Sequence, residues 1–430
     1  MRIGMVTACY KPVINGVTRM VSLYKQHLEA LGHEVTVFTL GEPDPNGDEP
    51  GVIRTPAIPL GSTGYYFSLG YSHEAQMLLQ QMDIVHCHHL LMSVELAHRY
   101  ARCPIVYTNH TRYDLYTGSV TPLPQPAADA LMRQLWPELA GLADAVIAPS
   151  ESVRQVLLEF GVSQPIYVIE NGIDLRPFRQ PLAPCTKEDL GIPSDAILLL
   201  YVGRFSPEKS LDLLLEQFVI ARDIVPNLHL ALLGKGPSER GIHELARSLQ
   251  IEDCVHFWGT VNFDEVGNYM AAADIFVTAS RSEVHPLTII EALAAGLPVV
   301  ASASPGIVDT VETGKTGILT SWVEGGLTAG MVSLAMNESL RREMSQAARQ
   351  AAERFDIQHT IAKTLALYEK LREDRPDLAR GRWVRQQNRL QPLVEQLTRL
   401  LRPEKPATGP LRWLPWQQNE ASEQTPEKVE

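Results

Sequence analysis

The sequence lacks the features that mark several protein classes. Its five cysteines are odd in number and show no Cys-x-x-Cys spacing, so neither a disulfide framework nor a zinc knuckle is indicated, and a reducing cytoplasm fits. No apolar run approaches the ~20 residues of a membrane-spanning helix, and residues 1–6 begin a strand without the apolar core and cleavage site of a signal peptide. We therefore expect a cytoplasmic protein, with any membrane contact peripheral.

Charge and glycine patterns exclude further classes. The formal charge of −12 argues against a general nucleic-acid binder, which needs a basic surface, so no nucleic-acid partner is expected. The loop after the first predicted strand, residues 8–17, contains one glycine, Gly16. It has neither the Gly-x-Gly-x-x-Gly of a dinucleotide site nor the Gly-Lys-Ser/Thr of a nucleoside-triphosphate loop. A dehydrogenase or a kinase is therefore not expected.

Length and hydrophobic alternation predict two domains. The 430 residues exceed the roughly 250–300 at which a single core stops growing. Short apolar runs alternate with helical patterns in two series, which is typical of α/β, doubly wound parallel sheets whose ligands bind at the carboxyl ends of the strands. We expect strands at residues 3–7, 34–40, 84–88, 105–109, 145–149 and 166–169, a further one at 52–59, and then at 197–202, 228–233, 255–258, 275–278 and 299–301. We expect helices at residues 17–31, 210–221, 239–249, 263–272 and 287–295.

Two carboxylates eight residues apart, Glu283 and Glu291, bracket a predicted loop-to-helix junction. Free N–H groups at the start of a helix suit a phosphate, and fixed carboxylates suit the hydroxyls of a sugar. Together they indicate a site for a sugar nucleotide. The spacing fits equally well a Glu283 that complements the helix dipole and a Glu291 on a solvated helix face.

Two other strand ends carry residues suited to a diphosphate. Arg204 and Lys209 follow the strand predicted at 197–202, and a diphosphate needs such cations. By itself, Arg204 also fits a partner for a sheet-edge carboxylate, and Lys209 also fits a solvated residue at the start of a helix. After the next strand, Gly234 and Gly236 lack side chains, so a base or phosphate can approach the backbone, although many strand-to-helix turns look like this.

Four histidines also lie at strand ends. His86, His88 and His89 fit either a zinc site or, better, neutral histidines capping a strand, because adjacent strand residues face opposite ways and no carboxylate or thiol completes a ligand set. His110 follows another strand and fits a buried, hydrogen-bonded imidazole as well as a functional residue. We predict no metal site.

In this order the motifs resemble the retaining, nucleotide-sugar-dependent glycosyltransferases of family 4, which have the GT-B architecture of two Rossmann-like domains. The resemblance covers about residues 1–370 and rests also on Gly32-His33-Glu34-Val35 and Val168-Ile169-Glu170-Asn171-Gly172-Ile173-Asp174. It implies an acceptor-binding domain at residues 1–175, a nucleotide-sugar-binding domain at 176–355, a helix at 356–375 that crosses back to the first domain, and an extension at 376–430. Bacterial members that glycosylate membrane lipids, such as diacylglycerol glucosyltransferases, look most similar.

The resemblance implies roles for single residues. Arg204 and Lys209 match the pair that binds the donor diphosphate and stabilises the leaving nucleotide. Glu291 matches the carboxylate on the ribose hydroxyls, and Glu283 matches the one that faces the transferred sugar. A UDP-sugar is the preferred donor, with neither a cofactor nor an essential metal. Further matches are His110 near the reacting centre, Gly16 in the loop that approaches the phosphates, Gly234 and Gly236, and the junction residues His285 and Leu287.

The junction departs from the family pattern. Family members often have Glu-Gly-Phe-Gly-Leu where this chain has Glu283-Val284-His285-Pro286-Leu287. Pro286 removes a backbone N–H that could bind the ligand, and we expect the side chain of His285 to supply a donor instead. Similarly, Gly306-Ile307-Val308-Asp309 replaces the usual Gly-Gly-x-Pro-Glu, which shortens the carboxylate by one methylene.

Two segments bear on the acceptor. Residues 61–71 include four aromatic rings that fit either contact with a lipid or packing over the sheet: Tyr65, Tyr66, Phe67 and Tyr71. Residues 381–416 combine arginines, leucines and tryptophans, which fits binding to an anionic membrane surface or packing on the body. We predict transfer of a sugar to a membrane lipid such as diacylglycerol. The alternatives are transfer to a soluble sugar or growing polysaccharide, and a non-catalytic scaffold.

Overall fold

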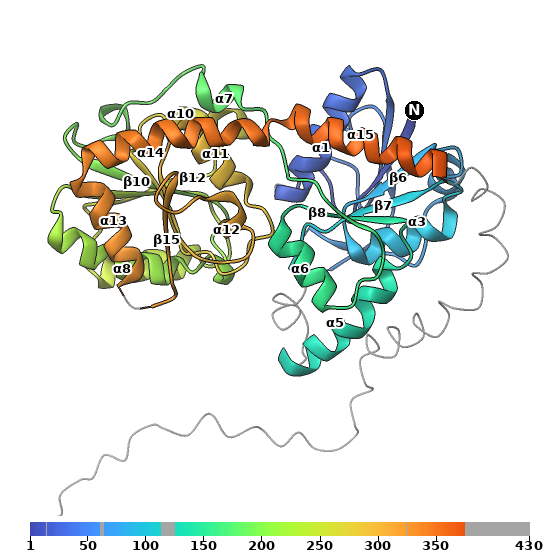
Figure 1. The fold of residues 1–430 in the computed structure, drawn as a ribbon, viewed down its shortest axis with the longest axis horizontal. Coiled ribbons are helices and arrows are strands. Elements are labelled where there is room, and N and C mark those ends of the chain that lie inside the picture. The colour runs from blue at the N-terminus through green and yellow to red at the C-terminus, as the bar shows by residue number, and fades with distance from the viewer. Residues whose placement is uncertain (14, 61–63, 113–124, 324, 375–430) are drawn as a thin grey trace, which may run out of the picture. The chain divides into compact units, whose positions relative to one another are not determined.

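The computed structural model describes residues 1–13, 15–60, 64–112, 125–323 and 325–374. These residues form two parallel sheets, one within residues 2–168 and one within residues 197–320, each with helices on both faces (Figure 1). The predicted α/β, doubly wound architecture is confirmed. The extension expected to contact a membrane, residues 381–416, lies outside the described residues. No described helix has the length and apolar character needed to cross a membrane.

The first sheet has seven parallel strands in the order β3-β2-β1-β6-β7-β8-β9. The order reverses direction between β1 and β6, which is where doubly wound sheets bind ligands. The strands are β1 (Arg2–Val6), β2 (Glu34–Leu40), β3 (Val52–Thr55), β6 (Ile84–Cys87), β7 (Ile105–Thr108), β8 (Ala145–Ala148) and β9 (Ile166–Val168). The strand predicted at 52–59 is divided, since Pro56 cannot donate to the ladder, and β4 (Ile58–Pro59) pairs antiparallel with β5 (Tyr66–Phe67).

Helices α1 (Gly16–Ala30) and α15 (Ile357–Asp374) lie on one face of the first sheet, and α5 (Gln125–Ala140) and α6 (Glu151–Glu159) on the other (Figure 1). Asn15 begins α1, because its side chain accepts a hydrogen bond from the backbone N–H of Thr18. The hydroxyl groups of Tyr24 and Thr364, 3.1 Å apart, join α1 to α15. Two further helices are α2 (His73–Leu79) and α3 (Glu95–Tyr100), preceded by a short η1 turn (Leu90–Val94).

The second sheet has six parallel strands in the order β12-β11-β10-β13-β14-β15. The central strand β10 is apolar on both faces. Leu198 and Leu200 pack with α11 (Leu287–Ala295), while Leu199 and Tyr201 pack with α8 (Leu211–Ile224) and α13 (Gly326–Met336). The strands are β10 (Ile197–Val202), β11 (Leu228–Leu233), β12 (Val255–Gly259), β13 (Ile275–Thr278), β14 (Val299–Ser302) and β15 (Gly317–Thr320). The predicted series ended at β14, and the structure adds β15.

The longer helices of this second half are α8 (Leu211–Ile224), α9 (Glu239–Ser248), α11 (Leu287–Ala295), α13 (Gly326–Met336) and α14 (Glu338–Ala351). The helix predicted at 263–272 is a 3-10 turn, η4 (Phe263–Glu265), followed by α10 (Val266–Met270). Shorter elements are α7 (Arg176–Arg179), α12 (Ile307–Thr310), η2 (Glu188–Leu190), η3 (Pro207–Lys209) and η5 (Ala352–Phe355).

Candidate functional site

The loop-to-helix junction forms as predicted, with α11 spanning Leu287–Ala295. Pro286 occupies the cap position before the helix, where its fixed φ is compatible and its missing N–H leaves no ladder bond broken. Gly296 ends the helix at a φ of 84°, a left-handed conformation that favours glycine. Glu283 therefore precedes the helix, and Glu291 lies in its second turn.

Glu291 is buried and forms an ion pair with Arg19 of α1. The exposed fractions of the two side chains are 1% for Glu291 and 12% for Arg19. The alternative in which Glu291 lies on a solvated helix face is therefore wrong. The carboxylate is held by a cation from the other half of the chain.

Arg19 is itself enclosed by other residues. Its guanidinium lies 4.6 Å from the ring centroid of Phe263 and 5.9 Å from that of Phe178. Burial lowers the pKa of Arg19 to about 10, although the charge of Asp264 acts in the opposite direction. The side chain is still protonated at neutral pH, so a desolvated cation faces a desolvated carboxylate.

Lys209 and Glu283 form a second ion pair, with 2.6 Å between Nζ and Oε1. Lys209 ends the η3 turn that follows β10, so the carboxyl end of this central strand lies beside the junction. Both side chains are largely buried rather than solvated. The residue expected on the diphosphate and the residue expected on the sugar thus contact each other.

Arg204 has an exposed side chain, in contrast to Lys209. Among the described residues it forms no ion pair, so it is not the partner of a sheet-edge carboxylate there. Its segment is fixed through the backbone: the hydroxyl of Tyr201 donates to the carbonyl oxygen of Arg204 at 3.1 Å. A fixed backbone with a free side chain is an arrangement that can receive an anion.

Gly234 and Gly236 pack against the segment that carries Arg204. A Cβ atom on Gly234 would lie 1.9 Å from the carbonyl oxygen of Gly203, and one on Gly236 would lie 2.3 Å from that of Phe205. Gly234 also has a φ of 150°. The two glycines are therefore required by close packing of two loops, in addition to any approach of a ligand.

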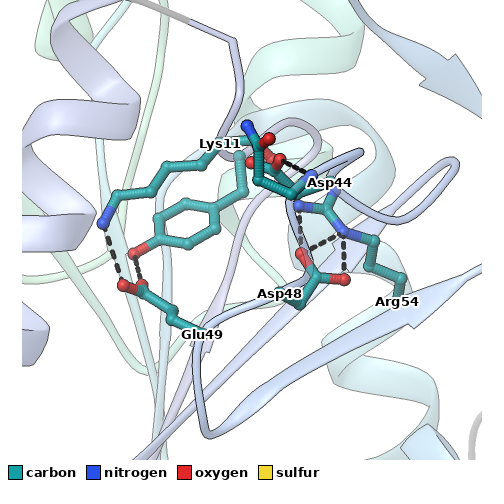
Figure 2. Close-up of polar contacts among 7 residues, drawn as sticks. Lys11, Asp44, Asp48, Glu49 and Arg54 are labelled. Carbon is teal, nitrogen blue, oxygen red and sulfur yellow. Dashed lines mark hydrogen bonds and ion pairs between the residues drawn. The ribbon is translucent and has the colours of Figure 1, made fainter.

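The start of α1 lies beside the start of α11. A Cβ on Gly16 would lie 4.0 Å from Cδ1 of Leu287, so these two predicted site residues are neighbours. The loop before Gly16 is anchored from the β2–β3 connection (Figure 2). There Glu49 accepts hydrogen bonds from the hydroxyl of Tyr10 at 2.5 Å and from Nζ of Lys11 at 2.9 Å. The anchored loop holds the first turn of α1 at the junction.

His285 does not donate to a polar group among the described residues. Its ring is buried edge-on against Phe355, with 5.2 Å between ring centroids, and neither ring nitrogen has a hydrogen-bond partner among the described residues. Burial lowers the pKa of His285 to about 3, so the ring is neutral. Its backbone oxygen accepts from Nδ2 of Asn171, which ties the junction to the motif at residues 168–174.

Three of the four strand-end histidines contact one another, whereas Nδ1 of His89 accepts a hydrogen bond from the backbone N–H of Ala8 at 3.1 Å. Nε2 of His110 lies 3.1 Å from Nδ1 of His88, and the ring of His86 lies 4.1 Å from that of His88. His86 also bonds the hydroxyl of Tyr368 on α15 at 2.6 Å. Burial lowers the pKa of each of these three rings, so they are neutral. Among the described residues no group of side chains could hold a metal ion.

Sequence reasoning missed two contributors to the junction. Ser150, which caps α6, donates from its hydroxyl to the carbonyl oxygen of Val284 at 3.1 Å, and nearby the backbone N–H of Ser152 donates to Oδ2 of Asp309 at 3.0 Å. Arg19 is the other. Its position three residues after Gly16, on the same helix face, is the signal that could have identified it.

The described contacts connect most, but not all, of the predicted residues. Glu283, His285, Leu287 and Glu291 share one junction, which Lys209 and Gly16 touch, whereas His110 contacts His88 instead. A cavity of about 680 Å³ lies elsewhere, between α7, α14 and the end of α11, and none of the predicted site residues lines it.

Comparison with known proteins identifies the family of this chain. The model of Glycosyltransferase Family 4 matches residues 14–176, and that of Glycosyl transferases group 1 matches residues 185–351. An alpha-monoglucosyldiacylglycerol synthase of Acholeplasma laidlawii is 32% identical over 335 residues, covering 74% of this chain and 84% of that protein. A D-inositol 3-phosphate glycosyltransferase of Catenulispora acidiphila is 30% identical over 341 residues, covering 75% of each chain.

Solved structures share the fold. HepE of Anabaena, in complex with UDP and glucose, has a TM-score of 0.71 at 19% identity, covering 86% of this chain and 100% of that one. Sucrose-phosphate synthase of Thermosynechococcus elongatus has a TM-score of 0.69 at 22% identity, covering 87% and 99%. The chain therefore belongs to the family 4, group 1 glycosyltransferases with the GT-B fold, and it is a hexosyltransferase.

Proposed function

We propose that this enzyme transfers a hexose from a UDP-sugar to a hydroxyl of a membrane lipid such as diacylglycerol, with retention of configuration. The observation that carries the donor site is the convergence of two carboxylate–cation pairs at the start of α11. Carboxylates can accept hydrogen bonds from ribose and hexose hydroxyls, and cations suit a diphosphate. Both carboxylates lie within the loop before α11 and its first two turns, and the two cations contact them there.

The proposed chemistry uses the leaving group. As the bond from the anomeric carbon to the diphosphate breaks, negative charge develops on the phosphate oxygens. Arg204 and Lys209 would stabilise that charge, and one such preorganised contact is worth about 3 kcal/mol in the transition state. The acceptor hydroxyl would enter on the face that the diphosphate leaves and give its proton to a phosphate oxygen. Glu283 would hold a hydroxyl of the transferred sugar.

The preference for UDP and for retention rests on relatives. HepE is described in complex with UDP and glucose, and the Acholeplasma protein is named for an alpha-glucoside. Because UDP-glucose carries its glucose as the α-anomer, formation of an alpha-glucoside from it retains configuration. We expect the same outcome here.

The lipid acceptor has support from the surface of the first half. Tyr71 is buried against Tyr100, so this ring packs inward instead of meeting a lipid. Aliphatic side chains within residues 58–69 are exposed instead, to 66% for Ile58, 48% for Leu60 and 64% for Leu69. We propose that the enzyme acts at the cytoplasmic face of the membrane and that residues 381–416 contribute cations to this association.

The test is a transfer assay with the purified full-length protein. UDP-, GDP- and ADP-sugars are each offered with vesicles that contain diacylglycerol, and in parallel with soluble acceptors, including inositol phosphate. We expect glycolipid from a UDP-sugar and vesicles, with the α configuration by NMR. Product only from soluble acceptors would favour the second candidate, transfer to a soluble sugar or sugar phosphate, which the 30% identity to the inositol-phosphate enzyme supports.

A further inference from the structure

Both carboxylates of the junction are already occupied in this structure. Glu283 contacts Lys209, and Glu291 contacts Arg19. Arg19 pairs with Oε1 of Glu291, and a ribose that donates both of its hydroxyls to this carboxylate uses both oxygens. Donor binding would therefore compete with Arg19 for Oε1.

The surroundings of Arg19 limit what that partner can be. The side chain is 12% exposed and lies against the rings of Phe263 and Phe178. Asp264 is the other acidic group whose charge acts on it. An unpaired guanidinium in such a desolvated place is costly, so a second anion must replace Glu291 when the ribose takes it.

Its place on α1 points to the diphosphate. Gly16, three residues earlier, lies next to Leu287 at the start of α11, where the free N–H groups of that helix favour phosphate. A guanidinium presents a planar fork that matches two phosphate oxygens, which an ammonium group does not.

We propose that Arg19 is a donor-binding residue, which pairs with Glu291 in this structure and turns to the donor diphosphate when the ribose binds Glu291. This inference rests on the proposed function, in particular on Glu291 as the ribose carboxylate. It adds a cation from the N-terminal half to Arg204 and Lys209 of the C-terminal half. The donor would then contact the N-terminal half through Arg19 and the C-terminal half through Arg204 and Lys209.

The experiment compares a nucleoside diphosphate with its nucleoside by calorimetry. UDP and uridine are titrated into the wild type, Arg19→Met and the matched control Arg222→Met, which removes an arginine that pairs with Asp253. We expect Arg19→Met to weaken UDP binding roughly tenfold or more, since a hydrogen bond to a charged group is lost. Uridine should bind as tightly as to the wild type or more tightly, because Glu291 no longer has a competing partner. Arg222→Met should change neither.

Other outcomes would overturn the proposal. If UDP binding by Arg19→Met equals that of the wild type, Arg19 does not contact the diphosphate. If UDP and uridine weaken equally, Arg19 only supports the fold. To guard against misfolding, the same comparison is made between Glu291→Gln and the double variant Arg19→Met/Glu291→Gln. A loss of UDP affinity that persists there supports the proposal, and its disappearance contradicts it.

Failure of the proposed function would look different. If the wild type binds no UDP, ADP or GDP, the donor site itself is refuted. If it binds ADP or GDP instead of UDP, the same titrations are made with that diphosphate and its nucleoside, and the test of Arg19 is unchanged.

Discussion

Substituting Glu291 by alanine should destabilise the protein strongly, because it leaves the charge of Arg19 buried without its partner. Removing one member of a buried ion pair typically costs about 3–5 kcal/mol. Arg19 is 12% exposed and has Asp264 nearby, so we expect the lower end, about 3 kcal/mol. For a domain of about 150–250 residues, that corresponds to a melting temperature roughly 6–12 °C lower. Differential scanning calorimetry of the apoenzyme measures it.

Two comparison variants isolate the cause. The double variant Arg19→Met/Glu291→Leu removes both charges and should recover most of the lost stability, since replacing a buried ion pair by apolar groups is often neutral. Glu353→Ala removes a carboxylate whose side chain is 62% exposed and should change the melting temperature by only a few degrees. A Glu291→Ala protein that melts within about 1 °C of the wild type would refute the buried pair.

Three further predictions concern single residues. Arg204→Ala should lower kcat roughly 100-fold or more at an unchanged melting temperature, because the side chain is exposed and the lost contact acts in the transition state; equal kcat would argue against its role. Gly234→Ala should unfold at a temperature several degrees lower, since its Cβ would meet the carbonyl oxygen of Gly203 at 1.9 Å, and unchanged melting would show that the loop can move. The lowered pKa of His285, about 3, means that the unfolded chain binds a proton first as pH falls, so stability is lost from about pH 6.5 downward. At pH 5, His285→Phe should lose about 2 kcal/mol less than the wild type, relative to each protein at pH 7.5, and parallel pH profiles would contradict this.

Elements with an unbroken local pattern could be predicted from the sequence. The strands Glu34–Leu40, Ile275–Thr278 and Leu228–Leu233 and the helix Leu287–Ala295 have the predicted bounds. Three of the four elements end at a glycine, which interrupts the local pattern: Gly41, Gly234 and Gly296. The strand predicted at residues 52–59 was wrong in its extent, because Pro56 cannot donate a hydrogen bond and the segment divides there into β3 and β4.

The candidate site was less accessible to sequence reasoning. Glu283, Glu291 and Lys209 could be named from motifs at strand ends, but the identity of their partners could not. Arg19 and Glu291 are 272 positions apart and meet only because two separate helices begin at the same place. The orientation of His285 likewise depends on Phe355, whose approach no local pattern encodes.

We propose that the junction between Glu283 and Glu291 is the donor site of a glucosyltransferase acting on lipid. The most direct test incubates radiolabelled UDP-glucose with diacylglycerol vesicles and either wild type or Lys209→Ala, and separates the lipid products. We expect labelled monoglycosyl lipid with the wild type and at least 100-fold less with the variant. Labelled lipid at equal rates from both proteins, or none from the wild type with any nucleotide sugar, would contradict it.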